Sequence, residues 1–405
     1  MQNSIFKIHH LITLFVVLVI ASFGLSVQAQ VAVRGETVWT MVGEPISNGV
    51  VLINNGKIEA VGAANQVNIP GNYKIVSAKV VTPGLIDAHT VIGLNGYLNQ
   101  PNDQMALDQS SPMQPELRAI DAYNPEEKLI EWVRSFGVTT IHTGHQPGAL
   151  ISGQTMIAKT VGKTADEAAI VPIAMVSVTL GDSAIVQGGK PPGTHAKQVA
   201  MLRAELIKAQ ENSNKKDAPN DLKSNIMLRV IRREIPLLVT AHKAIDIMNA
   251  IRLAKEFNIR IILDGVSEAQ VVLNEIKNSG FPVIVHPTMY RASGETEGLS
   301  MEDAAKLKAA GILVALQSGY ESYVPKTRVV LFEAGVATAN GLSFRDALAM
   351  ITIDAARILG LDKRIGSLEK GKDADLAMYD GDPFEYSTHC TGTIVNGQVA
   401  SDVIR

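Results

Sequence analysis

Side chains that bind metals or move protons recur where apolar runs end. Imidazole suits zinc and, because its ordinary pKa lies near neutrality, also serves as a general acid or base. A carboxylate in the same setting adds a second kind of ligand. The residues of this type are His89 after the run 85–88, His242 after 237–241, Asp264 after 261–263 and His286 after 283–285. Their combined chemistry would be activation of a water molecule, by a metal ion or by a base.

These runs belong to a repeated pattern of apolar strands and amphipathic helices. The spacing of Ile247, Ile251 and Ala254 on one face predicts a helix over 246–257. Alternating strands and helices predict a parallel α/β fold, and the number of units suits a TIM-like (β/α)8 barrel. An open doubly wound sheet is the alternative, although no glycine-rich phosphate loop follows a strand. The strand candidates are 137–141, 169–178, 237–241, 260–263, 282–285 and 312–316.

The two ends of the chain have a different texture of short strands and turns. Near the start, Asn55-Gly56 separates the runs 50–53 and 57–62, which is a strong hairpin signal. Similar short runs return at 374–379 and 392–399. We therefore expect both ends to build one small β-sandwich domain. The expected division is a small β domain from 30–82 and 365–405, and a barrel from 83–364.

The first 29 residues predict a secretory signal peptide. Lys7 precedes the apolar run 11–25, and Val27-Gln28-Ala29 offers a small-residue cleavage site before Gln30. A membrane anchor is the alternative, but a spanning helix needs about 20 apolar residues. We therefore expect an exported protein, periplasmic or secreted, with no membrane span after signal removal. With Cys390 as its one cysteine, the chain cannot form an internal disulfide.

Composition limits the classes of partner. The chain has 405 residues, 46% of them hydrophobic, with 37 basic and 40 acidic side chains. Such a chain is globular, and it lacks the basic excess of a nucleic-acid-binding protein. A small-molecule substrate or ligand is expected, and a homo-oligomer is possible.

Two motifs resemble the amidohydrolase superfamily. Residues 81–90, Val-Thr-Pro-Gly-Leu-Ile-Asp-Ala-His-Thr, resemble its Pro-Gly-Leu-Ile-Asp-x-His-x-His entry into the barrel, and 365–376 resembles its return to the small domain. The imidazolonepropionase-like branch is most similar, on Gly137-Val138-Thr139-Thr140, Gly153-Gln154 and the helix after His242. The resemblance implies one or two divalent metals, commonly zinc, at the carboxyl ends of the strands, and hydrolysis of an amide or other C–N bond by metal-activated water.

Three positions depart from the pattern that the resemblance implies. Val91 stands where the second histidine of His-x-His is expected, and Asp264 stands where a distal histidine is usual. Ser318 or Gly319 occupies the place of the catalytic aspartate. The metal ligands that remain are His89, His242 and Asp264, so we expect a depleted or rearranged metal site.

Further roles are assigned to charged residues and histidines near the expected mouth of the barrel. Lys159 would bridge two metals as a carbamylated lysine, or else be an ion-paired lysine, and we group it with His242 and His286 as catalytic. The expected substrate-binding residues are His142, His145 and Arg118. His142 and His145 could alternatively build a relocated metal site.

Two main functions follow from these residues. The first is a hydrolase that cleaves non-peptide C–N bonds, in an amide or cyclic amide, with metal-activated water. The second is a catalytically inactive binding protein that keeps the fold for a ligand pocket. A metal-free hydrolase with His242 as its base is a third route.

Overall fold

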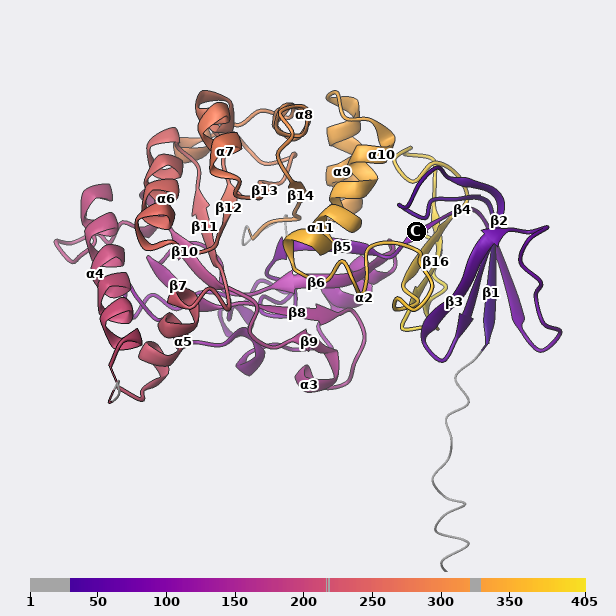
Figure 1. Ribbon diagram of the computed structural model, residues 1–405, viewed down its shortest axis with the longest axis horizontal. Coiled ribbons are helices and arrows are strands. Elements are labelled where there is room, and N and C mark those ends of the chain that lie inside the picture. The colour runs from indigo at the N-terminus through magenta and orange to yellow at the C-terminus, as the bar shows by residue number, and fades with distance from the viewer. Residues whose placement is uncertain (1–29, 216, 218, 321–328) are drawn as a thin grey trace, which may run out of the picture.

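The computed structural model describes residues 30–215, 217, 219–320 and 329–405 (Figure 1). The predicted signal peptide, 1–29, lies outside the described residues. Within the described part of the chain, no helix is long and apolar enough to cross a membrane.

Strands from both ends of the chain form one seven-stranded sheet, with the order β17-β16-β15-β4-β1-β2-β3. Figure 1 shows the yellow C-terminal strands beside the indigo N-terminal ones at one end of the molecule. The expected sandwich is therefore a single sheet in the described residues. Its strands are β1 Val31–Val38, β2 Ile46–Asn54, β3 Lys57–Ala63, β4 Lys74–Pro83, β15 Leu376–Tyr379, β16 Cys390–Val395 and β17 Gln398–Ser401.

The predicted hairpin joins β2 to β3. The two strands pair antiparallel down to Asn54 opposite Lys57. Asn55 has φ 50° and Gly56 has φ 75°. Left-handed backbone at both turn residues matches the twist of the flanking strands, and Asn-Gly adopts it with little strain.

The middle of the chain carries two further sheets. A four-stranded sheet has the order β5-β6-β8-β9, and a six-stranded sheet has the order β14-β13-β12-β11-β10-β7. One isolated bridge, between Thr90 and Gly319, connects their outer strands. The strands are β5 Leu85–Thr90, β6 Val138–Thr143, β7 Ile151–Gln154, β8 Met156–Lys159, β9 Ala169–Val171, β10 Val176–Thr179, β11 Leu237–Ala241, β12 Ile261–Gly265, β13 Val283–Val285 and β14 Val314–Leu316.

The arrangement is only partly the parallel barrel that we expected. Strands β10 to β14 are parallel, but β7, β8 and β9 each pair antiparallel with a neighbour. Parallel neighbours need a long crossover, and between β6 and β10 the only helix is the four-residue α3, Ala165–Ala168. The run expected as one strand over 169–178 is two strands, because Pro172 between them has no N–H for a ladder. A closed barrel is not recorded among the described strands.

Helices flank these sheets and bury their apolar faces. In α6 the residues expected on one face, Ile247, Ile251 and Ala254, are all buried. The segment 181–219 contains α4, which buries Leu202 and Leu206. Besides α3, the α-helices are α2 Lys128–Arg134, α4 His195–Ser213, α5 Leu222–Ile231, α6 Ala244–Phe257, α7 Leu273–Ser279, α8 Asp303–Ala309, α9 Val330–Ala339, α10 Phe344–Met350 and α11 Ile353–Ile358.

Candidate functional site

The inward faces of four parallel strands determine where the site lies. An apolar cluster takes one inward residue from each strand: Leu238, Ile262, Ile284 and Ala315. Side chains alternate along a strand, so the residues two positions later point the same way, closer to the carboxyl ends. These are Thr240, Asp264, His286 and Gln317, which we call the inner layer, and all four are buried.

Asp264 is the centre of the inner layer. Its Oδ2 accepts a hydrogen bond from Thr240 Oγ1 at 2.6 Å, and its Oδ1 accepts one from Gln317 Nε2 at 2.8 Å. Its Oδ1 also lies 3.1 Å from His89 Nδ1. Burial acts to raise the pKa of Asp264, but the neighbouring His89 and the hydrogen bonds from His89 and Thr240 hold this pKa below its ordinary value. Asp264 is therefore an ionised acceptor.

His89 reaches this carboxylate from the other sheet. The pairing of β5 with β6 shifts register between Asp87 and Thr90, so regular alternation is broken at this point. An ionised carboxylate can only accept, so Nδ1 of His89 carries the proton. The buried Nε2 has no hydrogen-bond partner, and the ring lies 5.4 Å from the Tyr320 ring between centroids. His89 thus holds a free nitrogen lone pair, oriented by a carboxylate.

His242 lies at the end of β11, where both of its ring nitrogens are engaged. Nδ1 is 2.8 Å from Ser267 Oγ, and Nε2 is 3.3 Å from the Tyr320 hydroxyl. Burial lowers the pKa of His242 to about 4; Asp264 opposes the shift and His286 adds to it. Gly265 has φ 86°, and a Cβ there would lie 2.6 Å from His242 Cε1. Glycine is required at that position for both reasons.

His142 and His145 do not form the pair that a relocated metal site would need. His142 is bonded through Nδ1 to the Ala88 carbonyl and through Nε2 to Thr155 Oγ1, both at 2.7 Å. Burial, reinforced by His89, lowers its pKa to about 3, so it is a neutral structural link. His145 is buried, and neither of its ring nitrogens has a partner. Burial also lowers its pKa.

His286 belongs to the inner layer but faces a different carboxylate. Its Nδ1 is 2.9 Å from the Pro287 carbonyl. Its Nε2 lies 3.6 Å from Asp303 Oδ2, which is too long for a hydrogen bond. Both side chains are 1% exposed. His286 thus lies near enough to His242 to influence its charge, and its own polar contacts do not include the His89–Asp264 pair.

Lys159, which we expected to be catalytic, lies apart from the inner layer. Its Nζ pairs with Asp375 and lies 3.2 Å from Asp373 Oδ2, all three side chains being buried. Lys159 sits opposite Thr140, whereas His142 sits opposite Ile157. The lysine therefore lies toward the amino end of β6, away from the inner layer. The charge of its ammonium is already balanced by these carboxylates. This placement agrees with the alternative of an ion-paired lysine, and the ion pair is buried.

Arg118 pairs with Asp121 on the surface of the protein, and its recorded contacts do not include the histidines of the inner layer or His89 and His242. Its Nε donates to Asp121 Oδ2 at 2.8 Å, and its side chain is 49% exposed. An exposed pair three residues apart contributes little to stability and nothing to the inner layer. The expectation that Arg118 binds substrate has no support in this geometry.

Several residues around the site were missed by the sequence interpretation. Thr240 and Gln317 hold Asp264, and Tyr320 lies against both His89 and His242. The period of two along each strand could have identified Thr240, inside the run 237–241, and Gln317, directly after the run 312–316. Nothing in the sequence indicates that Tyr320 folds over the histidines.

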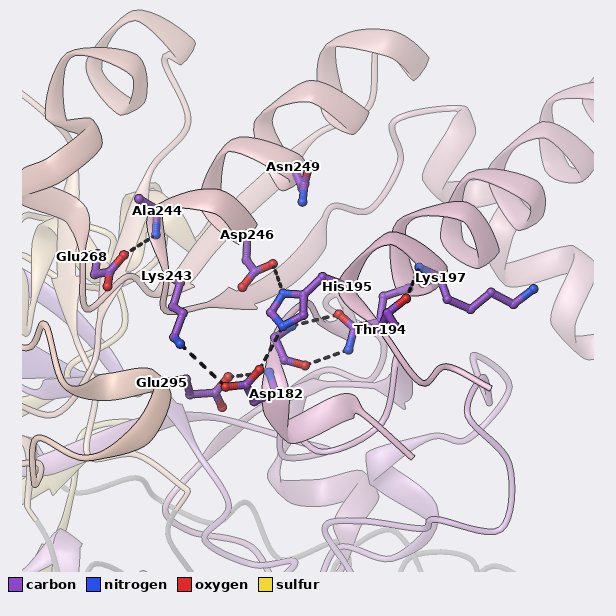
Figure 2. Close-up of polar contacts among 12 residues, drawn as sticks. Asp182, Thr194, His195, Lys197, Lys243, Ala244, Asp246, Asn249, Glu268 and Glu295 are labelled. Atoms are coloured by element: carbon purple, nitrogen blue, oxygen red, sulfur yellow. Dashed lines mark hydrogen bonds and ion pairs between the residues drawn. The ribbon is translucent and has the colours of Figure 1, made fainter. Parts of the chain in front are cut away.

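A charged cluster follows β10 and β11, at the same ends of the strands (Figure 2). His195, the first residue of α4, is 2.7 Å from Asp246 Oδ1 through Nδ1 and 2.9 Å from Asp182 Oδ1 through Nε2. Lys243 approaches Asp182 at 3.8 Å, and Glu295 accepts a hydrogen bond from the Asp182 backbone. The hydrogen bond to Asp246 is the main cause that raises the pKa of His195.

Comparison with known proteins agrees with this architecture. The model of the amidohydrolase family, Amidohydro_3, matches residues 94–400. The chain belongs to the amidohydrolase family. It is 23% identical over 367 residues to an imidazolonepropionase of Legionella pneumophila (strain Lens), covering 83% of this chain and 89% of the relative. A 5-methylthioadenosine/S-adenosylhomocysteine deaminase of Moorella thermoacetica is 24% identical over 379 residues, covering 87% and 86%.

A solved structure of an amidohydrolase from Thermotoga maritima MSB8 is also similar. It shares 27% identity with a TM-score of 0.86, and the match covers 92% of this chain and all of that one. The expected membership of the amidohydrolase superfamily, in its imidazolonepropionase-like branch, is confirmed.

Amidohydrolases typically use a divalent metal, but the residues of this amidohydrolase do not fit one. Within residues 30–215, 217, 219–320 and 329–405, no three His, Cys, Asp or Glu side chains are grouped to hold a metal ion. Of the expected ligands, Asp264 has both oxygens occupied and His242 has both nitrogens occupied. Val91 is 1% exposed within the main hydrophobic cluster. Among these three expected ligands, His89 alone keeps a ring nitrogen without a hydrogen-bond partner, and one ligand does not make a zinc site.

Proposed function

We propose that this protein hydrolyses a C–N bond in a small molecule with a water molecule activated by His89 and Asp264. The observation that supports the proposal is the free, buried Nε2 of His89, whose Nδ1 is held by an ionised carboxylate. Relatives named imidazolonepropionase and deaminase support the reaction class. An amide or a cyclic amide is the substrate class that we favour.

The chemistry follows from the orientation of the ring. Nε2 takes a proton from water as the water oxygen forms a bond to the substrate carbon. The C–N bond then breaks, and the leaving nitrogen takes the proton back from Nε2, so atoms and charge balance. Asp264 stabilises the imidazolium while it exists, as the carboxylate partner of a catalytic histidine does. Such a base contributes typically 10²- to 10⁴-fold to a rate.

His242 is less suited to be the base. Its nitrogens contact Ser267 and Tyr320, and its pKa of about 4 makes it a poor proton acceptor. We assign to the Tyr320 hydroxyl, 3.3 Å from His242 Nε2, the donation of a hydrogen bond to an oxyanion that develops on the substrate. In family members that hold a divalent metal, that ion supplies water activation, a task that His89 and Asp264 would perform in this chain.

The test is hydrolysis of a panel of amides, cyclic amides and aminopurines by the purified protein and three variants. His89→Gln and Asp264→Asn should each lower kcat/KM by about 10²-fold or more. His389→Gln, an exposed histidine with a single partner, Asp380, is the matched control and should match the wild type. A chelator should leave the wild-type rate unchanged. Activity that follows the content of a divalent metal would contradict the proposed base.

The second candidate is a binding protein without catalysis. It is favoured by the poor fit to a metal ion and by Ser318, which stands in the place of the family's aspartate and instead donates to Asp87. In that case panel members would raise the melting temperature of the protein and be recovered unchanged. Turnover by the wild type and not by His89→Gln decides for the hydrolase.

A further inference from the structure

A cavity lies at the end of the molecule opposite the inner layer. It has a volume of about 400 Å³. Its floor includes Pro236, Pro282 and Leu313, each of which immediately precedes a parallel strand. The cavity therefore lies at the amino ends of β11, β13 and β14, whereas Asp264 and His286 lie toward the carboxyl ends. A volume of this order holds a small ligand.

The charge of the cavity is one-sided. Its twelve lining residues include Arg233, Arg260 and Arg357 and no carboxylate. The whole chain has a formal net charge of -3, so the arginines gather here against the general balance. Within the described residues, an ion pair is recorded for Arg357 with Asp354 and none for the other two arginines. A concave site with charge of one sign attracts ligands of the other sign.

Two of the arginines are held in place by other groups. Arg233 Nη1 donates to the Asn258 carbonyl at 2.9 Å and to Asn258 Oδ1 at 2.6 Å. Arg357 Nη1 donates to Asp354 Oδ1 at 2.7 Å. Anchoring through one nitrogen leaves the remaining N–H groups of each guanidinium to bind an oxyanion. A held guanidinium loses less side-chain entropy when it binds.

Besides the arginines, the lining is mainly apolar, with Ser279 as the polar exception. Phe281, Pro282 and Leu313 are carbon surfaces that an apolar ligand body could cover. Guanidinium groups match the geometry of carboxylates and phosphates. The apolar residues of the floor favour a ligand that carries an apolar group in addition to its oxyanion.

We propose that this cavity binds a small organic oxyanion, a carboxylate or phosphate attached to an apolar body. The site is separate from the proposed catalytic pair, and it does not depend on the proposed reaction.

Calorimetric titration of the full chain with phenyl phosphate and with benzoate, at fixed ionic strength, tests the proposal. At least one of the two probes should give a saturable isotherm, and comparison of the two identifies the preferred oxyanion. Phenol should bind much more weakly because it lacks the charge, and inorganic phosphate more weakly because it lacks the ring. Failure of both probes to saturate overturns the proposal.

Variants locate the binding. Arg260→Gln and Arg233→Gln should each weaken binding by about tenfold, the usual effect of losing a charged hydrogen bond. Arg260→Lys keeps the charge without the fork and should lose less. Arg203→Gln is the matched control, because that arginine pairs with Glu256 outside the cavity. Equal weakening by the control, or loss of binding in His89→Gln with none in Arg260→Gln, would contradict the site.

Discussion

His89 Nδ1 lies 3.1 Å from Asp264 Oδ1, and both side chains are 0% exposed. The two residues come from β5 and β12, which belong to different sheets. Their contact therefore joins the sheets at the same point where it orients the free nitrogen of His89. In a buried setting a hydrogen bond of this kind is strong, and loss of one partner leaves the other uncompensated.

Restoring the family's missing histidine should not restore a metal site. Val91→His puts a polar imidazole into the main hydrophobic cluster in place of a buried apolar side chain. We expect the free energy of unfolding to fall by about 2–4 kcal/mol, the range for an unpaired buried polar group with a change of shape. Urea unfolding measures this, with Val91→Ala as the control for lost packing. One zinc per chain in Val91→His, found by elemental analysis, would contradict the expectation.

Lys159→Met should destabilise the fold without changing the chemistry. It leaves Asp375 and Asp373 buried beside each other with less positive charge, although Asp373 keeps Lys57 at 2.7 Å and Arg364 at 2.8 Å. Breaking a buried pair in this way costs about 3–5 kcal/mol. The rate per folded molecule should be that of the wild type.

A second substitution checks the cause. Lys159→Met combined with Asp375→Asn removes both charges, and part of the lost stability should return. If Lys159→Met instead folds fully and loses activity, the lysine has the catalytic role that we expected from the sequence.

The sequence predicts features that depend on neighbouring residues well, and features that depend on contacts between distant residues poorly. The strand 237–241, the Asn55-Gly56 hairpin and the helix at 246–257 are determined by local patterns, and all three are confirmed. The role of Lys159 depends on residues more than 200 positions later, which a motif near position 159 cannot indicate. The bond between His89 and Asp264 likewise depends on a register shift in β5 that carries no sequence signal.

The stability of the protein should fall in acid partly because of His142. Its pKa is about 3 in the folded chain against 6.5 ordinarily, so folding favours the neutral ring. This contribution is complete above pH 6.5 and is lost as the pH falls toward 3. Between pH 7 and about pH 4, the wild type should lose about 3 kcal/mol relative to His142→Gln. Urea unfolding across that range measures the difference; an unchanged gap would mean that the ring is not held neutral.

His195 should give the opposite dependence. Its pKa is raised, first by the hydrogen bond to Asp246, so the charged ring is favoured in the folded state. That stability is complete below the ordinary pKa and disappears as the pH rises through the raised one. Melting temperatures of the wild type and His195→Gln should therefore converge as the pH rises above the ordinary pKa of histidine and through the raised one. The groups that face the ring are Asp182 and Asp246, with Lys243 and Glu295 beside Asp182; divergence with rising pH would contradict the assignment.

The sheet shared by the two ends of the chain fixes an order of events during synthesis. Strands β1 to β4 leave the ribosome first, but β4 pairs with β15, which is made almost 300 residues later. Until then the edge of β4 has no partner, and an open strand edge invites pairing with another chain. The sheet that contains the first strands to be synthesised is therefore completed only near the end of translation. A chaperone that shields the edge of β4 would have to stay bound for most of that time.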